Sequence, residues 1–259
     1  MKKGEKRDRA DVAAEAWMAA LAMFADAQPA GFHRMGAHGT SVLVTGAPMS
    51  LLNGVFSVAR EADADEVACF AAAPGLAAVT WSVQVRGEHV GHRIADTAAR
   101  HGLDRRMTLP FMIKKLTEED AGATGTSEPR VRRVAGAEGD TYRETMAAGY
   151  EGPAEIFTAF TLPAVMDHVS MSAYLAEAAG VPVATSFGVL VNDLVGVFNL
   201  AVPPPHRRRG YGRAATAAVL RDAYEAGART AFLHASPMGV PLYLDMGFRT
   251  AENWTIFTS

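Results

Sequence analysis

The segment VPPPHRRRGYGRAA, Val202–Ala215, limits the folds open to this chain more than any other stretch. An apolar run with the pattern of a strand, LVGVFNLA, comes before it, and small and apolar residues typical of a helix follow it. Pro203–Pro205 cannot extend the hydrogen-bond ladder of a sheet, so the strand must end there. The segment therefore predicts a strand, a short basic loop and a helix, in that order.

The loop has the chemistry of an anion-binding site. The first backbone N–H groups of a helix have no partner within it, and they lie at the positive end of the helix dipole. Gly210 and Gly212 let the backbone approach a ligand closely, and Arg207, Arg208 and Arg209 can pair with phosphate oxygens. We interpret the loop as a cradle for a diphosphate. The alternative is that the three arginines are a charged run that faces solvent.

Two common phosphate loops fit this segment poorly. A Walker A loop requires Gly-Lys followed by Ser or Thr, which the segment lacks. Gly210, Gly212 and Ala215 have the spacing of a dinucleotide-binding fingerprint, but that motif opens the first βαβ unit of its fold and needs an acidic residue at the end of the next strand. Here the next strand ends in LHAS, and hairpins precede the loop.

Hydrophobic patterns give residues 130–259 the order β-α-α-β-β-β-α-β-α-β. Three of these strands, 170–178, 181–191 and 194–202, are joined by the short turns AG and ND, as in consecutive hairpins. The polar residues 117–129 are typical of a linker, and they separate this half from residues 11–116, an α/β mixture. Residues 1–10 are expected to form a disordered tail, and Asp11 to cap a helix that runs to about Ala27.

The loop and a second motif together resemble the GNAT acetyltransferase superfamily. The coenzyme A loop of that family has the pattern Arg/Gln-x-x-Gly-x-Gly/Ala after a strand that usually ends in Val-x-Pro, and Arg207, Gly210, Gly212 and Val202–Pro204 match it. The segment PMGVPLYLDMGF, residues 237–248, resembles the closing segment of the family, in which a helix carries a tyrosine just before Gly-Phe. The resemblance implies the GNAT fold for residues 130–259: an α/β (α+β) protein whose mixed, mostly antiparallel central sheet is flanked by helices.

The resemblance also implies how acetyl-CoA, the acyl donor, would bind. In such proteins the strand before the loop separates from the next strand, and the pantetheine arm lies in the gap against the backbone, much as an added strand would. The diphosphate lies in the loop. The residues expected to contact the cofactor are Leu200, Ala201, Val202, Arg207, Arg208, Arg209, Gly210, Tyr211, Gly212 and Arg213.

Acyl transfer to an amine requires a base, a donor to the oxyanion and an acid for the leaving thiolate. Tyr243 matches the family position of the acid; the alternative is that it only packs within its helix. A backbone N–H near Asn199 or Leu200 would meet the oxyanion. Many such enzymes place a glutamate on the strand before the loop, but this strand has none. The candidates that remain for the base are Glu177, Asp193, Asp167 and His234.

The first half has neither motif. SLLNGVFS, residues 50–57, and the strand and helix patterns that follow it resemble the degenerate leading half of tandem GNAT proteins. Such a half would pack against the second half without binding coenzyme A. The residues predicted to pack in the core or at the interface, with contact to the acceptor as the alternative, are Asn53, Trp81, Phe111 and Met112.

Composition limits the binding partners and the cellular compartment that we expect for the protein. A net charge of −3 argues against nucleic-acid binding, and Cys69 alone can form neither an intrachain disulfide nor a thiolate metal cluster, so no metal site is expected. No apolar run reaches the roughly 18 residues that span a bilayer. The acids Asp8, Asp11 and Glu15 favour an ordinary N-terminal helix over a signal peptide. We expect a cytoplasmic protein with no membrane partner.

These observations predict an acetyl-CoA-dependent N-acyltransferase that acts on a primary amine of a small-molecule or peptide acceptor by direct attack on the thioester. The alternative, favoured by the missing glutamate, is a coenzyme A-binding sensor or regulatory module without catalysis. The sequence leaves a homodimer open.

Overall fold

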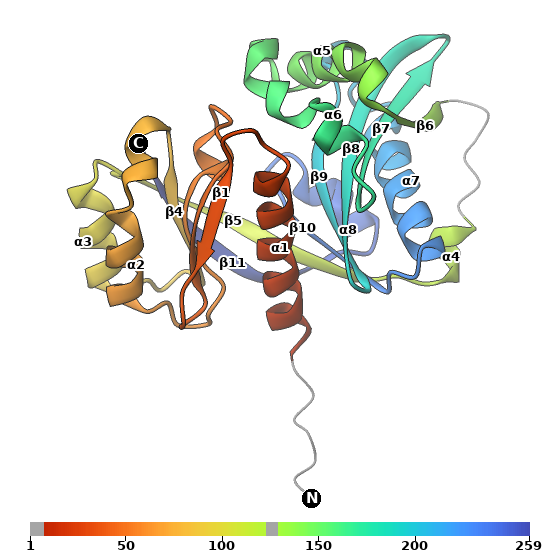
Figure 1. The fold of residues 1–259 in the computed structure, drawn as a ribbon. Helices are drawn as coiled ribbons and strands as arrows, with labels where there is room; N and C mark the ends of the chain where they lie inside the picture. Colours follow the sequence, from red (N-terminus) through yellow and green to blue (C-terminus); the bar gives the residue numbers. More distant parts are fainter. Residues whose placement is uncertain (1–7, 123–128) are drawn as a thin grey trace, which may run out of the picture.

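One continuous sheet of eleven strands runs through the molecule (Figure 1). The computed structural model describes residues 8–122 and 129–259. The strand order is β1-β2-β3-β4-β11-β5-β10-β9-β8-β7-β6, and only the pairs β3/β4 and β9/β10 are parallel within it. The predicted mixed, mostly antiparallel sheet flanked by helices is confirmed.

The first half builds one end of this sheet. Its elements are α1 (Arg9–Asp26), β1 (Phe32–Met35), β2 (Thr40–Val44), η1 (Ser50–Leu52), β3 (Gly54–Ser57), α2 (Ala64–Ala71), η2 (Pro74–Ala78), β4 (Ser82–Arg86), α3 (His92–Arg100) and β5 (Arg105–Lys115). The predicted linker at 117–129 includes a short helix, α4 (Glu118–Ala121), and its residues 123–128 lie outside the described residues.

The second half has the element order that the sequence predicted. Its elements are β6 (Arg130–Val134), η3 (Gly136–Glu138), α5 (Gly139–Tyr150), η4 (Ala154–Phe160), α6 (Pro163–Met166), β7 (Met171–Ala178), β8 (Val181–Val191), β9 (Leu194–Ala201), η5 (Pro204–His206), α7 (Tyr211–Glu225), β10 (Thr230–His234), α8 (Val240–Asp245) and β11 (Arg249–Thr258).

The two halves repeat one topology and exchange a strand. Each contains a strand, a helix, a parallel strand, a second helix and a long last strand: β3-α2-β4-α3-β5 in the first half and β9-α7-β10-α8-β11 in the second. The last strand of each half lies in the other half, because β5 is inserted between β10 and β11, and β11 between β4 and β5. The halves therefore share their central strands and are not joined through the segment 117–129 alone.

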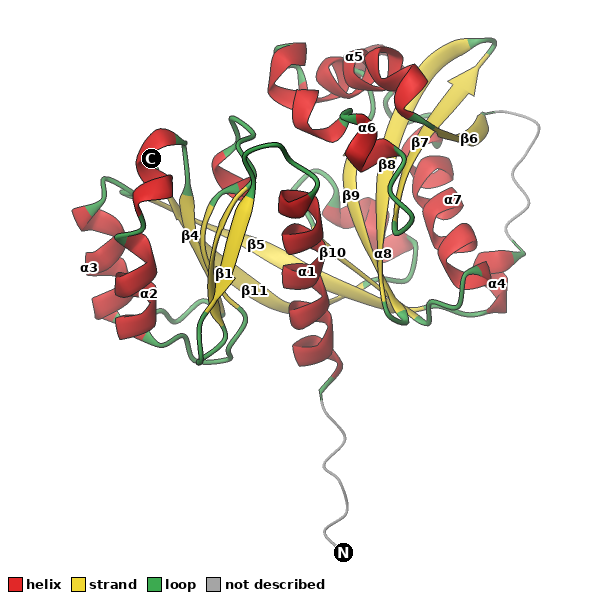
Figure 2. Cartoon of the chain, in the orientation of Figure 1, coloured by secondary structure: helices red, strands yellow, loops and turns green. Residues whose placement is uncertain are grey.

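Helices cover both faces of the sheet (Figure 2). On one face, α1 contacts β2 of the first half and β8, β9 and β10 of the second, and α5 covers β8 and β9 beside it. The apolar residues of α7 and α8 form a separate core against β9 and β10 on the other face. No helix within residues 8–122 and 129–259 is both long enough and apolar enough to cross a membrane.

The first helix begins earlier than predicted. Asp8, not Asp11, is its N-cap, and the Asp8 carboxylate accepts a hydrogen bond from the Ala10 N–H at 3.1 Å. Of the predicted tail, residues 1–7 lie outside the described residues. Because Asp8 caps the helix, the Asp11 carboxylate is free to bind arginines from two strand ends.

Arg86 ties α1 to both halves of the sheet. Its side chain is 2% exposed and donates to Asp11 at 2.8 Å, to the Val58 carbonyl at 3.0 Å and, from two nitrogens, to Glu252 of β11. Burial alone would raise the pKa of Asp11, but hydrogen bonds from Arg60 and Arg86 outweigh burial and hold that pKa below its usual value.

We expect Arg86→Met to lower the free energy of unfolding by about 3–5 kcal/mol, since it leaves two carboxylates partly buried without their cation. Urea denaturation followed by circular dichroism measures the change. Arg93, whose ion pair with Asp65 is exposed, is the matched control, and Arg93→Met should change the midpoint little. Equal effects of the two substitutions would contradict a structural role for Arg86.

Candidate functional site

A gap opens between β9 and β10, at the place that the resemblance to the GNAT superfamily implied. The parallel ladder joins them only at three pairs, the last of which is Gly196 with Phe232. Beyond it, β9 stays paired with β8 up to Ala201, while His234 of β10 stays paired with Phe111 of β5. One edge of β9 therefore has free backbone groups over its last five residues, directly before the predicted diphosphate loop.

The loop after β9 presents backbone N–H groups to this gap. Arg208 and Gly210 adopt left-handed conformations, with φ of 63° and 84°, directly after Arg207, which is extended. Such alternation of backbone conformations is typical of loops whose N–H groups bind an anion. Gly210 is the N-cap of α7 and no side chain caps the helix; the first helical bond runs from the Ala214 N–H to the Gly210 carbonyl at 3.0 Å. The N–H groups at the start of α7 are left free for an anion.

The Arg207 side chain points away from this role. Its guanidinium donates to the Val202 carbonyl at 3.1 Å, to the Gly149 carbonyl at 2.9 Å and to the Glu151 carboxylate at 2.7 Å. Arg207 thus clamps the loop to the C-terminal end of α5. The sequence predicted its side chain to pair with phosphate, and the difference arises because α5 brings carbonyl and carboxylate oxygens next to the loop.

The other three arginines of the segment differ in whether their side chains have an ion-pair partner. Arg208 and Arg209 are exposed, and neither has an ion-pair partner in the part of the chain that the structure describes. Arg213, on the first turn of α7, is bound to Asp245 of α8. Two uncommitted guanidinium groups therefore accompany the free N–H groups of the loop.

Gly212, in the first turn of α7, packs closely against the end of β9 and α8. A methyl group on it would lie 3.4 Å from a Val202 methyl, 3.5 Å from a Leu242 methyl and 3.8 Å from a Leu200 methyl. The end of β9, the start of α7 and α8 therefore meet at this glycine. The backbones of Leu200, Ala201 and Val202, predicted to hold the pantetheine arm, form the adjoining edge.

Tyr243 of α8 and Tyr150 of α5 are close enough to interact electrostatically. Tyr243 of α8 is 6% exposed, and burial raises its pKa, with a further contribution from Tyr150 at the end of α5. Tyr150 is 48% exposed, but protein atoms surround its hydroxyl and raise its pKa to about 12. Both phenols remain protonated at neutral pH, so both can donate a proton or a hydrogen bond.

Two of the four candidate bases serve structural roles, and a third lies at the far end of β9. Glu177 of β7 binds Arg132 through two hydrogen bonds, and Asp167 accepts a bond from the Gly136 N–H at 3.0 Å. Asp193 lies in the β8–β9 turn, at the opposite end of β9 from the gap. None of the three lies beside Tyr243.

His234, the fourth candidate, lines the gap at the end of β10. Its ring contacts Trp17, Phe111 and Trp254 at centroid distances of 5.1, 5.0 and 4.9 Å, and its Nε2 atom is buried with no partner among the described residues. Burial lowers its pKa to about 3, which makes it too weak a base to take a proton from an ammonium group. It remains neutral at physiological pH.

The first half lacks such a gap. All four residues of β3 are paired with β4, and the Arg86 guanidinium binds the Val58 carbonyl just past the end of β3. The N-terminus of α2 is occupied as well, because Asp63 accepts hydrogen bonds from the Asp65 and Glu66 N–H groups at 2.9 and 3.0 Å. The Asp63 carboxylate therefore occupies the N-terminus of α2, whereas no side chain caps the N-terminus of α7.

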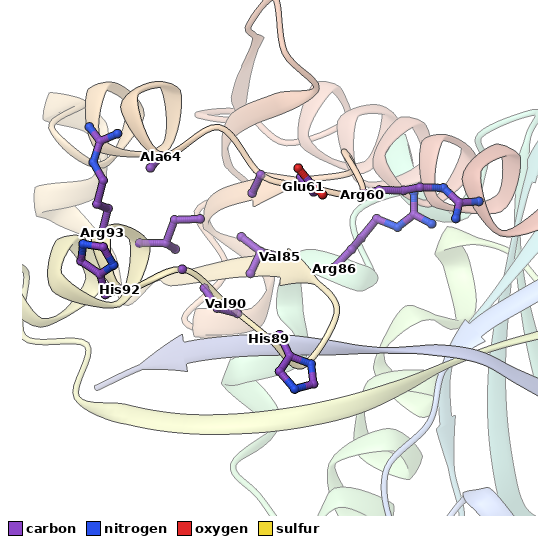
Figure 3. A pocket seen from close by; sticks show the side chains of 12 residues that line it. Arg60, Glu61, Ala64, Val85, Arg86, His89, Val90, His92 and Arg93 are labelled. Atoms are coloured by element: carbon purple, nitrogen blue, oxygen red, sulfur yellow. The ribbon is translucent and has the colours of Figure 1, made fainter.

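A cavity of about 290 Å³ lies in the first half, between the N-termini of α2 and α3 (Figure 3). Its cationic side chains are already neutralised: Arg60 binds Asp8 and Asp11, and Arg93 binds Asp65. Because the gap between β9 and β10 combines free donors with a free strand edge, we place the functional site there and not in this cavity. No cluster of three or more metal-binding side chains occurs among the described residues.

The residues predicted as core or interface are buried or held by partners. Phe111 and Met112 are fully buried in the core. Asn53 is fully buried and donates and accepts six hydrogen bonds around the β2–β3 connection, and Trp81 packs on His101. The clamp at Arg207 and the Asn199 amide that is unpaired among the described residues are features that no residue pattern revealed, because each depends on partners distant in sequence.

Comparison with known proteins finds a family match in the second half. Residues 142–248, less than half of the chain, match the model of the Acetyltransferase (GNAT) family. The enzymes of this family use acetyl-CoA as the acyl donor. Comparison with curated protein sequences gave no significant match.

Solved structures share the fold over the whole chain. A GCN5-related N-acetyltransferase from Kribbella flavida is 19% identical with a TM-score of 0.68, over 98% of this chain and 96% of that one. A conserved protein of unknown function from Staphylococcus epidermidis is 11% identical with a TM-score of 0.66, over 91% and 96% of the two chains. Their similarity extends over both halves and shows the fold alone.

We expect the stability of the protein to fall as the pH drops from about 6.5 toward 3, because the unfolded chain then binds a proton at His234 that the folded chain does not. The slope from this residue reaches at most about 1.4 kcal/mol per pH unit. His234→Phe should flatten the dependence, measured by urea denaturation between pH 4 and 7, whereas His92→Phe, at an exposed position, should not. An unchanged slope in His234→Phe would show that the imidazole is not held neutral by burial.

We expect Arg207→Ala to lower the free energy of unfolding by about 1–2 kcal/mol, since it removes the clamp between the loop and α5. Arg209→Ala should leave stability unchanged and instead weaken acetyl-CoA binding and its dependence on salt. Thermal denaturation and calorimetric titration at two salt concentrations separate the effects. A reversed pattern would place the Arg207 side chain on phosphate.

Proposed function

We propose that the protein transfers the acetyl group of acetyl-CoA to a primary amine of a small-molecule or peptide acceptor by direct attack on the thioester. The observation that carries this proposal is the gap between β9 and β10, which opens onto a loop with free N–H groups and two unpaired arginines. A strand edge beside an anion site is the combination that a pantetheine arm with a diphosphate requires.

The residues present fit acetyl-CoA. Backbone groups of Leu200, Ala201 and Val202 would bind the pantetheine arm, since β10 has left that edge of β9. The N–H groups of residues 208–213 would hold the diphosphate, with the Arg208 and Arg209 side chains adding charge. Tyr211, Gly212 and Arg213 contribute through the backbone at the start of α7, because the Arg213 side chain is bound to Asp245.

Tyr243 is the acid in this proposal. As the amine nitrogen bonds to the thioester carbon, an electron pair moves onto the carbonyl oxygen; when it returns, the C–S bond breaks and the sulfur takes the proton of Tyr243. The raised pKa of Tyr243 keeps its proton in place until the thiolate forms. The amine reacts in its neutral form, and its surplus proton passes to solvent, since the described residues offer no base beside Tyr243. The tyrosine is then reprotonated from water.

The first half acts as a structural partner in this proposal. Its closed β3/β4 ladder, the Arg86 guanidinium at the end of β3 and the self-capped α2 leave no site for a second coenzyme A. We therefore regard residues 11–116 as a degenerate GNAT-like half, and expect one coenzyme A per chain.

A second candidate function is a coenzyme A-binding sensor or regulatory module. The absence of an ionisable base beside Tyr243 in the described residues favours it. Both functions predict binding of acetyl-CoA, and only the enzyme predicts release of free thiol in the presence of an amine.

We expect acetyl-CoA at a hundredfold excess over its Kd to stabilise the protein by about 2.7 kcal/mol. With an accepted amine, thiol release should fall by about 10²–10⁴-fold in Tyr243→Phe, while acetyl-CoA binding is retained. A screen of primary amines read out by a thiol reagent gives the rate, and Tyr224→Phe, in the last turn of α7, is the matched control. Equal turnover in Tyr243→Phe would remove Tyr243 from the mechanism, and binding without turnover for every amine would favour the sensor.

A further inference from the structure

Two buried nitrogen atoms without partners lie on the two strands that border the gap. They are Nδ2 of Asn199 on β9 and Nε2 of His234 on β10, and neither has a hydrogen-bond partner among the described residues. Buried polar groups in folded proteins are nearly always paired, and an unpaired donor is costly. Both atoms lie past the last β9/β10 pair, where a bound substrate would be enclosed.

Asn199 owes its position to an irregularity in β9. The register with β8 shifts between Thr185 and Phe187, so β9 holds an extra residue opposite Ser186. Asn199 has a φ of 49°, a left-handed conformation that asparagine tolerates better than most residues, and its carbonyl accepts a hydrogen bond from the Thr185 hydroxyl at 3.1 Å. The bulge thus changes the backbone conformation of Asn199 near the point where the gap begins.

Conformation alone does not account for the choice of asparagine. Asn192, in the β8–β9 turn at the other end of β9, has a similar φ of 54°, but its side chain is exposed to water. At Asn199 the chain instead keeps an amide N–H₂ group buried and unpaired. A backbone that needed only a left-handed residue would be served by glycine without that cost.

We propose that the Asn199 side-chain amide donates a hydrogen bond to the carbonyl oxygen of the bound thioester and to the oxyanion formed from it. The inference rests on the proposed function. A carboxamide N–H₂ donates and cannot accept, which suits an oxygen that gains negative charge as the amine attacks. Asn199 neither gains nor loses a proton in the step; it stabilises the electron pair on oxygen until the C–S bond breaks.

His234 lies on β10, the strand on the other side of the gap. Its ring packs among Trp17, Phe111 and Trp254 and stays neutral, so it brings no charge to compete for the oxyanion. Apolar surroundings of this kind would strengthen a hydrogen bond from Asn199.

The test compares acetyl-CoA with free coenzyme A, which lacks the carbonyl. In Asn199→Gly, which keeps the left-handed conformation, acetyl-CoA binding should weaken by about fivefold to tenfold while coenzyme A binding stays unchanged. Infrared difference spectra of acetyl-CoA with a ¹³C-labelled carbonyl should show the bound band at lower frequency than in water-free solvent, and a return toward higher frequency in Asn199→Gly. Asn199→Asp, which replaces the donor by an acceptor, should bind acetyl-CoA more weakly still.

Asn192→Gly and Asn192→Asp are the matched controls, since they make the same changes at a left-handed position far from the gap, and neither should alter binding or the carbonyl band. Equal weakening of both ligands in Asn199→Gly, or an unchanged carbonyl band, overturns the role of Asn199 while leaving the proposed function standing. Undiminished acetyl-CoA binding in Asn199→Asp overturns it too. Failure of the unmodified protein to bind either ligand refutes the proposed function itself.

Discussion

The antiparallel pairing of β5 with β11 is the interaction on which the rest of the structure depends. Each strand is the last of its own half and completes the sheet of the other half, so the two ladders at the centre cross from one half to the other. Neither half buries its central strand edges without its partner, since β10 would lose β5 and β4 would lose β11. Both halves must therefore fold together, and α1 seals the junction by packing Trp17 against Trp254 and Phe56.

The two halves share their central strands and have similar topologies, but they differ in how their parallel strand pairs end. In the second half, β10 stays paired with β5 but leaves β9 after three pairs, so one edge of β9 has no strand partner over its last residues. In the first half, β3 and β4 stay paired, and charged groups of the chain itself, Arg86 and Asp63, satisfy the strand end and the helix N-terminus. The strand edge is therefore open at the end of β9 and closed along β3.

The sequence predicted a large part of this arrangement. The element order of residues 130–259, the end of β9 at the prolines and the helix after Gly210 follow from periodicity and from residues with restricted backbones. Other features escaped prediction because their partners are distant in sequence. The Arg207 clamp requires α5, 56 to 58 positions away, and the exchange of β5 and β11 joins strands more than 130 residues apart. The N-cap at Asp8 was missed because Asp11 is an equally good capping residue, and only its pairing with Arg86 shows that it has another use.

The sequence by itself determined which residues can bind an anion and where strands must stop, because glycine, proline and arginine carry those properties in any fold. Only the tertiary structure decided which arginines are free, which strand edge is open and which asparagine is buried without a partner among the described residues. These properties belong to pairs of groups and not to single residues, and pairs are set when distant strands are brought into register.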